Sequence, residues 1–311
     1  MKPIRFIPDD TKIPFMKYSR FGLFLSGILC AASLLMFVFV GLNIGVDFKG
    51  GTVITIRTEQ PADLDQLRST INDLGLGSAE LQEFGSPNDV LIRIGTQDGG
   101  DEAQQAAVNK IKEALGSGIE YRSVEVVGPK VSGELAQEGI VAVVLALVLV
   151  LIYVWFRFEW QFALAAIFSL MHDVILTVGL FSLIGLEFNL SIIAAILTII
   201  GYSLNDTVVI FDRIREFLRK YKTMPLVDLL DFSINSVLPR TLMTSVSVLI
   251  ALVALYVYGG EVLSGFTFTM IWGVLVGTYS SFFIAAPLLL LLGTVRETSR
   301  AESKAAAAAR P

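Results

Sequence analysis

Two polar residues, Asn205 and Asp206, lie inside the apolar stretch 194–211 of the sequence, and charged residues follow directly beyond it. Counting back from Phe211 at 1.5 Å per helical residue places Asp206 roughly 8 Å inside the apolar region. A carboxylate at such a depth costs free energy unless it has a partner, and such groups often carry protons. We therefore predict that Asp206 and Asn205 belong to a proton pathway. The alternative is a structural polar group that only joins two helices.

A second pair of candidates lies near the middle of another apolar run. His172 is the only histidine of the sequence and stands beside Asp173, about 12 residues after Trp160. Adjacent residues on a helix point about 100° apart, so the two side chains need not touch, yet both can face one polar seam. We predict that they belong to the proton pathway. Hydrogen bonds that merely fix helix packing are the alternative.

Arg240 follows Pro239 at the predicted start of a later apolar run. It is expected at the same depth as Asp206. A guanidinium near that carboxyl would tune its affinity for a proton, so Arg240 completes the predicted pathway.

Six apolar runs of the sequence are long enough to cross a bilayer as helices. The chain has 311 residues, of which 54% are hydrophobic and only 17% charged, as is typical of integral membrane proteins. The fold class that we predict is a membrane bundle of six transmembrane helices. The first run is too long for a cleavable signal peptide and should remain as an anchor. The predicted spans are 21–42, 139–156, 160–186, 188–211, 237–258 and 262–293.

The polar interval 43–138 predicts a small external α+β domain between the first two spans. Alternating and helical patterns occur in the order β-α-β-β-α-β, which is the ferredoxin-like arrangement. The interval contains no histidine and no cysteine, so contact rather than chemistry is its expected work. The predicted strands are 52–58, 80–84, 89–94 and 119–127, and the predicted helices are 61–74 and 101–115.

Glycines and a proline flank this interval where the chain leaves and re-enters the apolar region. Gly50 and Gly51 precede the first strand, and Gly128 and Pro129 follow the last. They predict hinges that let the domain move, although ordinary turns use the same residues. In a later run, Gly273 and Gly277 predict close helix packing.

Basic residues cluster at one end of the predicted spans, and the short connections at the other end carry none. The positive-inside rule places both termini in the cytoplasm and 43–138 outside. The predicted cytoplasmic parts are the N-terminus 1–20, the loop 212–236 and the tail 294–311. Within that loop, 212–231 is predicted to form an interfacial helix.

Several classes of function are excluded by missing residues. The sequence has no phosphate-binding loop and no zinc-protease motif, and its single histidine and single cysteine, Cys30, leave no second such ligand for a metal. We expect no enzyme activity, no cofactor, no metal and no nucleic-acid partner. Energy would come from a proton gradient, or from a sodium gradient.

Six motifs, in order, resemble one family between about residues 15 and 297. They are GVDFKGGT, VEVVGP, YVWFRFEWQFALAA, LMHDVILTVG, GYSLNDTVVIFDRIRE and PRTLMTS. This pattern resembles the SecF family of the bacterial Sec protein-export machinery, which is similar to the resistance-nodulation-division transporters. The resemblance implies a multi-pass protein of the bacterial inner membrane. It also implies partnership with SecD, the SecYEG channel and YajC, and use of the proton-motive force to move and release preproteins.

In that family the acid of the S-L-N-D motif and the arginine that opens the fifth helix are implicated in the proton pathway, and they correspond to Asp206 and Arg240. A proton-coupled small-molecule exporter subunit of the same superfamily is one alternative. An assembly factor with a structural buried acid is another. An external domain of about 90 residues offers a surface rather than a drug-sized cavity, which disfavours the exporter.

Overall fold

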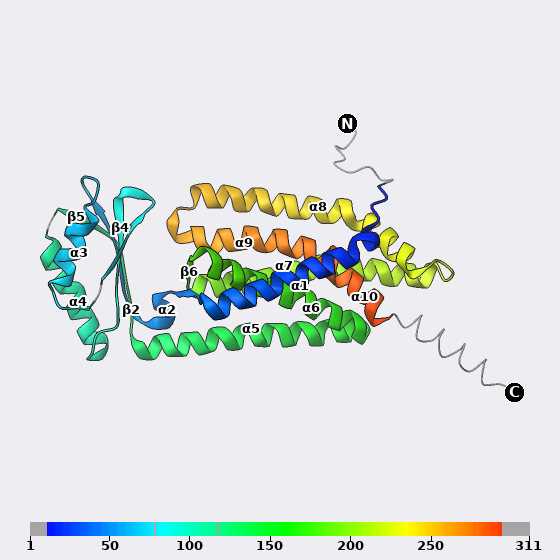
Figure 1. The fold of residues 1–311 in the computed structure, drawn as a ribbon, viewed down its shortest axis with the longest axis horizontal. Coiled ribbons are helices and arrows are strands. Elements are labelled where there is room, and N and C mark those ends of the chain that lie inside the picture. Colours follow the sequence, from blue (N-terminus) through cyan, green and yellow to red (C-terminus); the bar gives the residue numbers. More distant parts are fainter. Residues whose placement is uncertain (1–10, 78, 117, 294–311) are drawn as a thin grey trace. The chain divides into compact units, whose positions relative to one another are not determined.

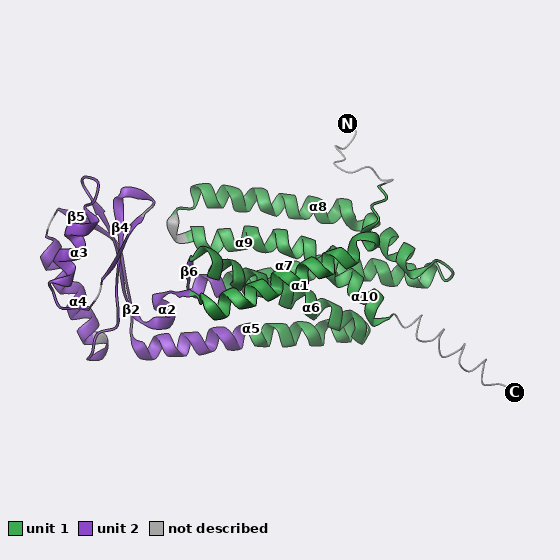
Figure 2. Cartoon of the chain, viewed as in Figure 1, with its two compact units in different colours: residues 1–42, 143–185, 194–311 green, residues 43–142, 186–193 purple. Residues whose placement is uncertain are grey.

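The computed structural model describes residues 11–293 except 78 and 117. The predicted tail 294–311 and the first half of the predicted segment 1–20 lie outside the described residues. The chain divides into two compact units (Figure 2): unit 1 comprises 1–42, 143–185 and 194–311, and unit 2 comprises 43–142 and 186–193.

Six helices in the described part of the chain are long and apolar enough to cross a membrane, which confirms the predicted number of spans. The last span consists of two helices joined by a short π-helical segment, η1. The helices are α1 Phe15–Phe39, α5 Pro129–Arg157, α6 Trp160–Ile184, α7 Leu190–Lys220, α8 Leu226–Tyr258, α9 Glu261–Ser280, η1 Ser281–Ala285 and α10 Ala286–Leu292.

The helices of unit 1 pack closely where glycines remove side chains. Figure 1 shows α1 alongside α6 and α8 alongside α9, and both pairs are in contact. A Cβ atom built on Gly273 of α9 would lie 2.2 Å from the Cδ1 atom of Ile199 on α7, and one on Gly277 would lie 2.9 Å from the Cβ of Ser203. The predicted packing surface is therefore a real contact between α9 and α7.

The segment η1 widens the last span just before Pro287. Proline has no amide hydrogen to offer the carbonyl group one turn earlier. A wider π-type turn is one way in which a helix accommodates such an interruption. This turn brings Ser281 to the buried interior of the bundle.

The structure has helix where the sequence predicted the loop 212–236. Helix α7 continues to Lys220 and α8 begins at Leu226, so the connection covers only 221–225, and no separate interfacial helix forms. The residues between the charges keep the helical spacing: Ile214 and Phe217 are buried and belong to one core cluster with Leu230 of α8. The charged residues mark the end of the apolar stretch but not the end of the helix. Similarly, α5 begins ten residues before the predicted span 139–156.

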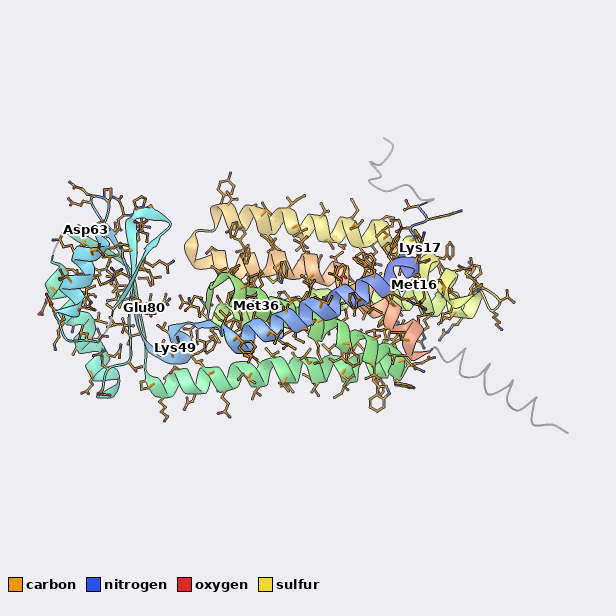
Figure 3. The ribbon with its side chains drawn as sticks, in the orientation of Figure 1. Met16, Lys17, Met36, Lys49, Asp63 and Glu80 are labelled. Atoms are coloured by element: carbon orange, nitrogen blue, oxygen red, sulfur yellow. The ribbon has the colours of Figure 1, made fainter. Side chains whose placement is uncertain are left out.

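Helix α8 also holds the start of α1. The carboxylate of Asp231 accepts a hydrogen bond from the Met16 backbone N–H at 2.8 Å, and Asn235 exchanges two hydrogen bonds of 2.9 Å with the backbone of Ile13. Met16 and Lys17 lie on the first turn of α1 (Figure 3). A side chain from α8 thus satisfies an orphan N–H of α1.

Unit 2 contains the predicted element order β-α-β-β-α-β. Its four strands form one antiparallel sheet in the order β3-β4-β2-β5, and two helices lie together on one face of it (Figure 1). Buried aliphatic side chains such as Ile54, Ile92 and Ile111 fill the space between them. The elements are β2 Gly51–Thr58, α3 Leu64–Asn72, β3 Glu80–Phe84, β4 Ser86–Ile94, α4 Gly100–Leu115 and β5 Ile119–Val127.

Three short elements of unit 2 were not predicted: β1 Asn43–Ile44, α2 Val46–Lys49 and β6 Glu187–Phe188. β1 and β6 pair in parallel. Asp47 of α2 accepts a hydrogen bond of 2.8 Å from the backbone N–H of Leu190, the first residue of α7, and Arg93 of β4 forms an ion pair with Glu187 of β6. These contacts join the segment that follows α1 to the segment that leads into α7.

Two of the predicted hinge glycines occupy positions that other residues would strain. Gly50 has a φ of +74° and Gly51 a φ of +123°, and a Cβ on Gly51 would lie 2.5 Å from the carbonyl oxygen of Ile94. Both residues are needed for backbone conformation and close approach. Gly128 and Pro129 lie at the junction of β5 and α5, where proline is well suited to the first turn of a helix. Motion at these four positions stays a prediction.

The carboxylate of Asp89 on β4 contacts three other side chains of unit 2. Its carboxylate accepts hydrogen bonds from Nε and Nη2 of Arg57 at 2.7 and 2.5 Å and from Ser86 at 2.8 Å, and Arg122 lies 3.7 Å away. The hydrogen bonds from Arg57 lower the pKa of Asp89 from 3.8 to about 2, against the opposing effect of burial. Because the folded pKa lies below the unfolded value, this stabilisation is complete above about pH 4 and is lost as the pH falls towards 2.

Replacing Asp89 by asparagine should reduce the stability of unit 2 by about 2 kcal/mol, because charge-assisted hydrogen bonds to a buried carboxylate are lost. Hydrogen exchange of peptides from β2 and β4 in the whole chain measures this effect. Asp65→Asn is the matched control, since the Asp65 side chain is 93% exposed in its pair with Arg68. If the peptides from β2 and β4 were equally protected from hydrogen exchange in the Asp89 and Asp65 variants, the prediction would be contradicted.

Candidate functional site

Asp206 lies on the buried stripe of α7. Ser203, Asp206, Thr207 and Ile210 follow the i, i+3, i+4, i+7 spacing and all face the interior. The Asp206 side chain is only 3% exposed, and among the described residues no group donates a hydrogen bond to its buried Oδ2. A carboxylate oxygen without a protein donor inside a membrane bundle is expensive when charged, so the site favours an incoming cation or proton.

Asn205 does not join this site. Its side chain is exposed and lies on the opposite face of α7 from the buried stripe. Exposed small or polar residues at the same helical spacing continue along this face, which we call the exposed α7 stripe: Ala194, Thr198, Gly201 and Asn205.

Arg240 lies within α8 rather than at its start, because the helix begins at Leu226. Its side chain is exposed, and its charge acts electrostatically on Asp206. Within the described part of the chain, however, the two residues form no direct ion pair. The structure thus brings Arg240 near Asp206 without a bond between them.

His172 and Asp173 of α6 are in direct contact. Nδ1 of His172 lies 3.0 Å from Oδ1 of Asp173, and both side chains are at least 95% buried. The other carboxylate oxygen, Oδ2, accepts hydrogen bonds from Ser203 of α7 at 2.6 Å and from Ser280 of α9 at 2.9 Å. Asp173 therefore joins three helices at one point.

A second polar contact joins α7 to the last span. The Thr207 and Ser281 hydroxyl groups are 2.9 Å apart, and Ser281 donates a hydrogen bond to the carbonyl of Gly277 at 2.9 Å. These serines and Thr207 were not predicted as site residues. Ser203 could have been found from its helical spacing to Asp206, whereas Ser280 and Ser281 depend on how the last span packs against α6 and α7.

The arrangement gathers several proton-binding groups inside the bundle. It contains two buried carboxylates, one imidazole and several hydroxyl groups on the facing surfaces of α6, α7 and the last span. No group of three or more histidine, cysteine, aspartate or glutamate residues that could hold a metal occurs among the described residues. The fold and this centre define a multi-pass membrane protein with ionisable groups in its helical core.

Comparison with known proteins places this chain in a family. The family described as protein export membrane protein SecD/SecF, C-terminal, matches residues 107–295, and the SecD/SecF GG motif matches residues 35–62. The chain belongs to the SecD/SecF family of protein-export membrane proteins.

Full-length relatives carry the name of one subunit of the Sec pathway. The protein translocase subunit SecF of Cereibacter sphaeroides is 43% identical over 97% of this chain and 96% of the relative, and that of Magnetococcus marinus is 45% identical over 91% and 92%. The SecDF subunit of Brucella abortus is 43% identical over 96% of this chain, but the match covers 40% of that relative.

A solved structure has the same fold. The crystal structure of SecDF from Thermus thermophilus, described as a translocon-associated membrane protein, is 33% identical and superposes on 92% of this chain with a TM-score of 0.81. The chain spans 39% of that structure's length. The similarity of the chain to its relatives is thus found in the fold as well as in the sequence.

Proposed function

We propose that this chain works together with a SecD subunit. The pair uses a proton gradient across the membrane to promote the movement of preproteins through the SecYEG channel and their release from it. The observation that carries the proposal is the buried carboxylate oxygen of Asp206, which no described donor satisfies. A proton crossing the membrane releases about 2.3 kcal/mol per 100 mV, which can drive a change in conformation. Arg240 acts on Asp206 through its charge and would tune proton binding.

The partnership with SecD is supported by relatives whose name, SecDF, combines SecD and SecF in a single chain. The Brucella relative and the Thermus structure are both called SecDF, and this chain spans 40% and 39% of their lengths. The exposed α7 stripe offers a contact surface for the partner. Asn205 lies there inside an apolar helix, where an amide gains from a hydrogen bond to a neighbouring helix.

The proposal includes a location and an orientation. The chain would lie in the bacterial inner membrane with both termini in the cytoplasm, as its basic residues favour. The α+β domain of unit 2 would be periplasmic and of the ferredoxin-like class, since its strand order is β3-β4-β2-β5. Gly50, Gly51, Gly128 and Pro129 would allow it to move, and YajC would be a further partner. A sodium gradient could replace the proton gradient without a change in these contacts.

An exporter of small molecules is less well supported. The relatives cited above are named translocase subunits. The four-stranded sheet of the α+β domain with its two helices offers a contact surface, whereas an exporter needs a cavity for its substrate.

Copurification from native membranes tests the partnership. Affinity-tagged chain extracted in mild detergent should bring down a SecD subunit and components of the channel. Asn205→Leu should reduce the recovered SecD subunit severalfold, because it removes the amide from the contact surface. Ser247→Leu is the matched control, since Ser247 is also an exposed polar residue of a spanning helix but lies on α8. The partnership would be contradicted if no SecD subunit were recovered with the unaltered chain. Equal losses in the two variants would contradict the role of Asn205.

A further inference from the structure

His172 presents a nitrogen atom that the contacts described so far do not use. Its Nδ1 faces Asp173, but its Nε2 is buried and has no hydrogen-bond partner among the described residues. We propose that Nε2 of His172 is a second proton-accepting atom of the bundle and that Asp173 is its positioning residue. This inference rests on the proposed ion-coupled function and names a site within it.

The contact with Asp173 decides which nitrogen of the ring is free. An ionised carboxylate can only accept hydrogen bonds, so Nδ1 must carry the proton when Asp173 is charged. The lone pair then lies on Nε2. Carboxylate partners of this kind orient histidine rings in many functional sites.

Asp173 is itself held in place from two other helices. Its Oδ2 accepts the hydroxyl hydrogens of Ser203 and Ser280 at 2.6 and 2.9 Å, so both carboxylate oxygens are occupied without a metal ion. These two bonds fix the orientation of the carboxylate, so that Oδ1 remains directed at the imidazole. Because Ser203 precedes Asp206 by three residues on the same buried face, movement of α7 would act on both acidic groups.

The protons and charges of the His172–Asp173 pair can be counted for each step of proton binding. A proton binds to Nε2, and the proton on Nδ1 can pass along the hydrogen bond of 3.0 Å to Oδ1 of Asp173. The charge of the pair changes from −1 to 0, with no other reactant. Release of the proton reverses both steps.

Few other titratable groups face the pair. Tyr279 of α9 lies with its ring 6.2 Å from the imidazole, and its hydroxyl group is bonded to Ser26 of α1. Cys30 of α1 lies within electrostatic range of Asp173. From α7 the nearest acidic group on the shared face is Asp206, and η1 and α10 contain no titratable residue.

A single histidine makes the proposal directly measurable. Chain labelled with ¹⁵N-histidine and purified with a tag that contains no histidine gives imidazole signals from His172 alone. Nitrogen NMR in lipid vesicles should show a protonated Nδ1 and an unprotonated Nε2 at high pH, and protonation of Nε2 as the pH is lowered. Asp173→Asn should abolish the preference for the Nδ1 proton, because an amide can either donate or accept.

Variants connect this site to transport. His172→Asn keeps a donor for Asp173 but removes Nε2, and it should reduce gradient-dependent export in vesicles about tenfold or more. Ser182→Ala, which removes a partly buried hydrogen bond elsewhere on α6, should leave export unchanged. In Asp206→Asn, the His172 signals should still titrate even where export is lost.

The outcomes separate this inference from the proposed function. A protonated Nε2 at every pH, absence of any titration, or full export by His172→Asn would overturn the role of His172. A dependence of the signals on sodium but not on pH would also overturn it. By contrast, full gradient dependence in Asp206→Asn would contradict the proposed function, while the NMR result would still decide the protonation of His172.

Discussion

Replacement of Asp206 by asparagine is expected to abolish gradient-dependent export while the chain still folds and binds its partners. Asparagine has nearly the same shape and can keep the packing of the buried α7 stripe, but it cannot bind and release a proton. One proton that crosses a potential of 100 mV is worth about 2.3 kcal/mol, or roughly a fiftyfold change in an equilibrium constant. Inverted membrane vesicles with and without a gradient measure the loss.

The matched control for this substitution lies on the same helix. Asp212 is about half exposed and forms an ion pair of 2.9 Å with Arg157, away from the buried stripe. Asp212→Asn should therefore retain gradient-dependent export. Equal export by the Asp206 variant, the Asp212 variant and the unaltered chain would show that the Asp206 carboxyl does not carry the coupled ion.

The largest structural effect is expected at Gly179, where α6 touches α1. A Cβ atom on Gly179 would lie 2.2 Å from the Cβ of Ser33 and 2.7 Å from its Cα, so the two helix backbones must separate. Gly179→Ala should therefore destabilise the protein by about 1–3 kcal/mol. Thermal unfolding in detergent, followed by loss of the native helical signal, measures the change.

Gly27 of α1 provides the control, because a glycine-to-alanine substitution there should not lower the stability. A Cβ there would meet no atom within 4 Å, so Gly27→Ala should be neutral or slightly stabilising through its higher helix propensity. Ser33→Gly should rescue Gly179→Ala only in part, because the Cα of residue 33 remains too close. Equal stability of the two alanine variants would contradict the proposed contact.

The elements that the sequence predicted best were those with strong local patterns. Long apolar runs indicated the six spans, and the predicted bounds of the strands β3 and β5 agree with the observed bounds. The burial of Asp206 was also predictable, since its position inside an apolar helix is a local property.

The remaining features depend on contacts between distant segments. The charges after Phe211 suggested that α7 ends there, but burial of Ile214 and Phe217 against α8 keeps the helix regular. Capping of α1 by Asp231 and pairing of β1 with β6 join residues far apart in the chain, and neither leaves a periodic signal. The assignment of Asn205 to the same site as Asp206 overlooked that adjacent helical residues point in different directions.

Proton entry into sealed proteoliposomes is the most direct test of the central claim. Vesicles containing the chain and its SecD partner, with a pH-sensitive dye inside and a potassium ionophore to compensate charge, would receive an inward proton gradient. The account predicts protein-dependent acidification in the unaltered chain and in Asp212→Asn, and none above empty vesicles in Asp206→Asn. Acidification of equal rate in Asp206→Asn and the unaltered chain would contradict it.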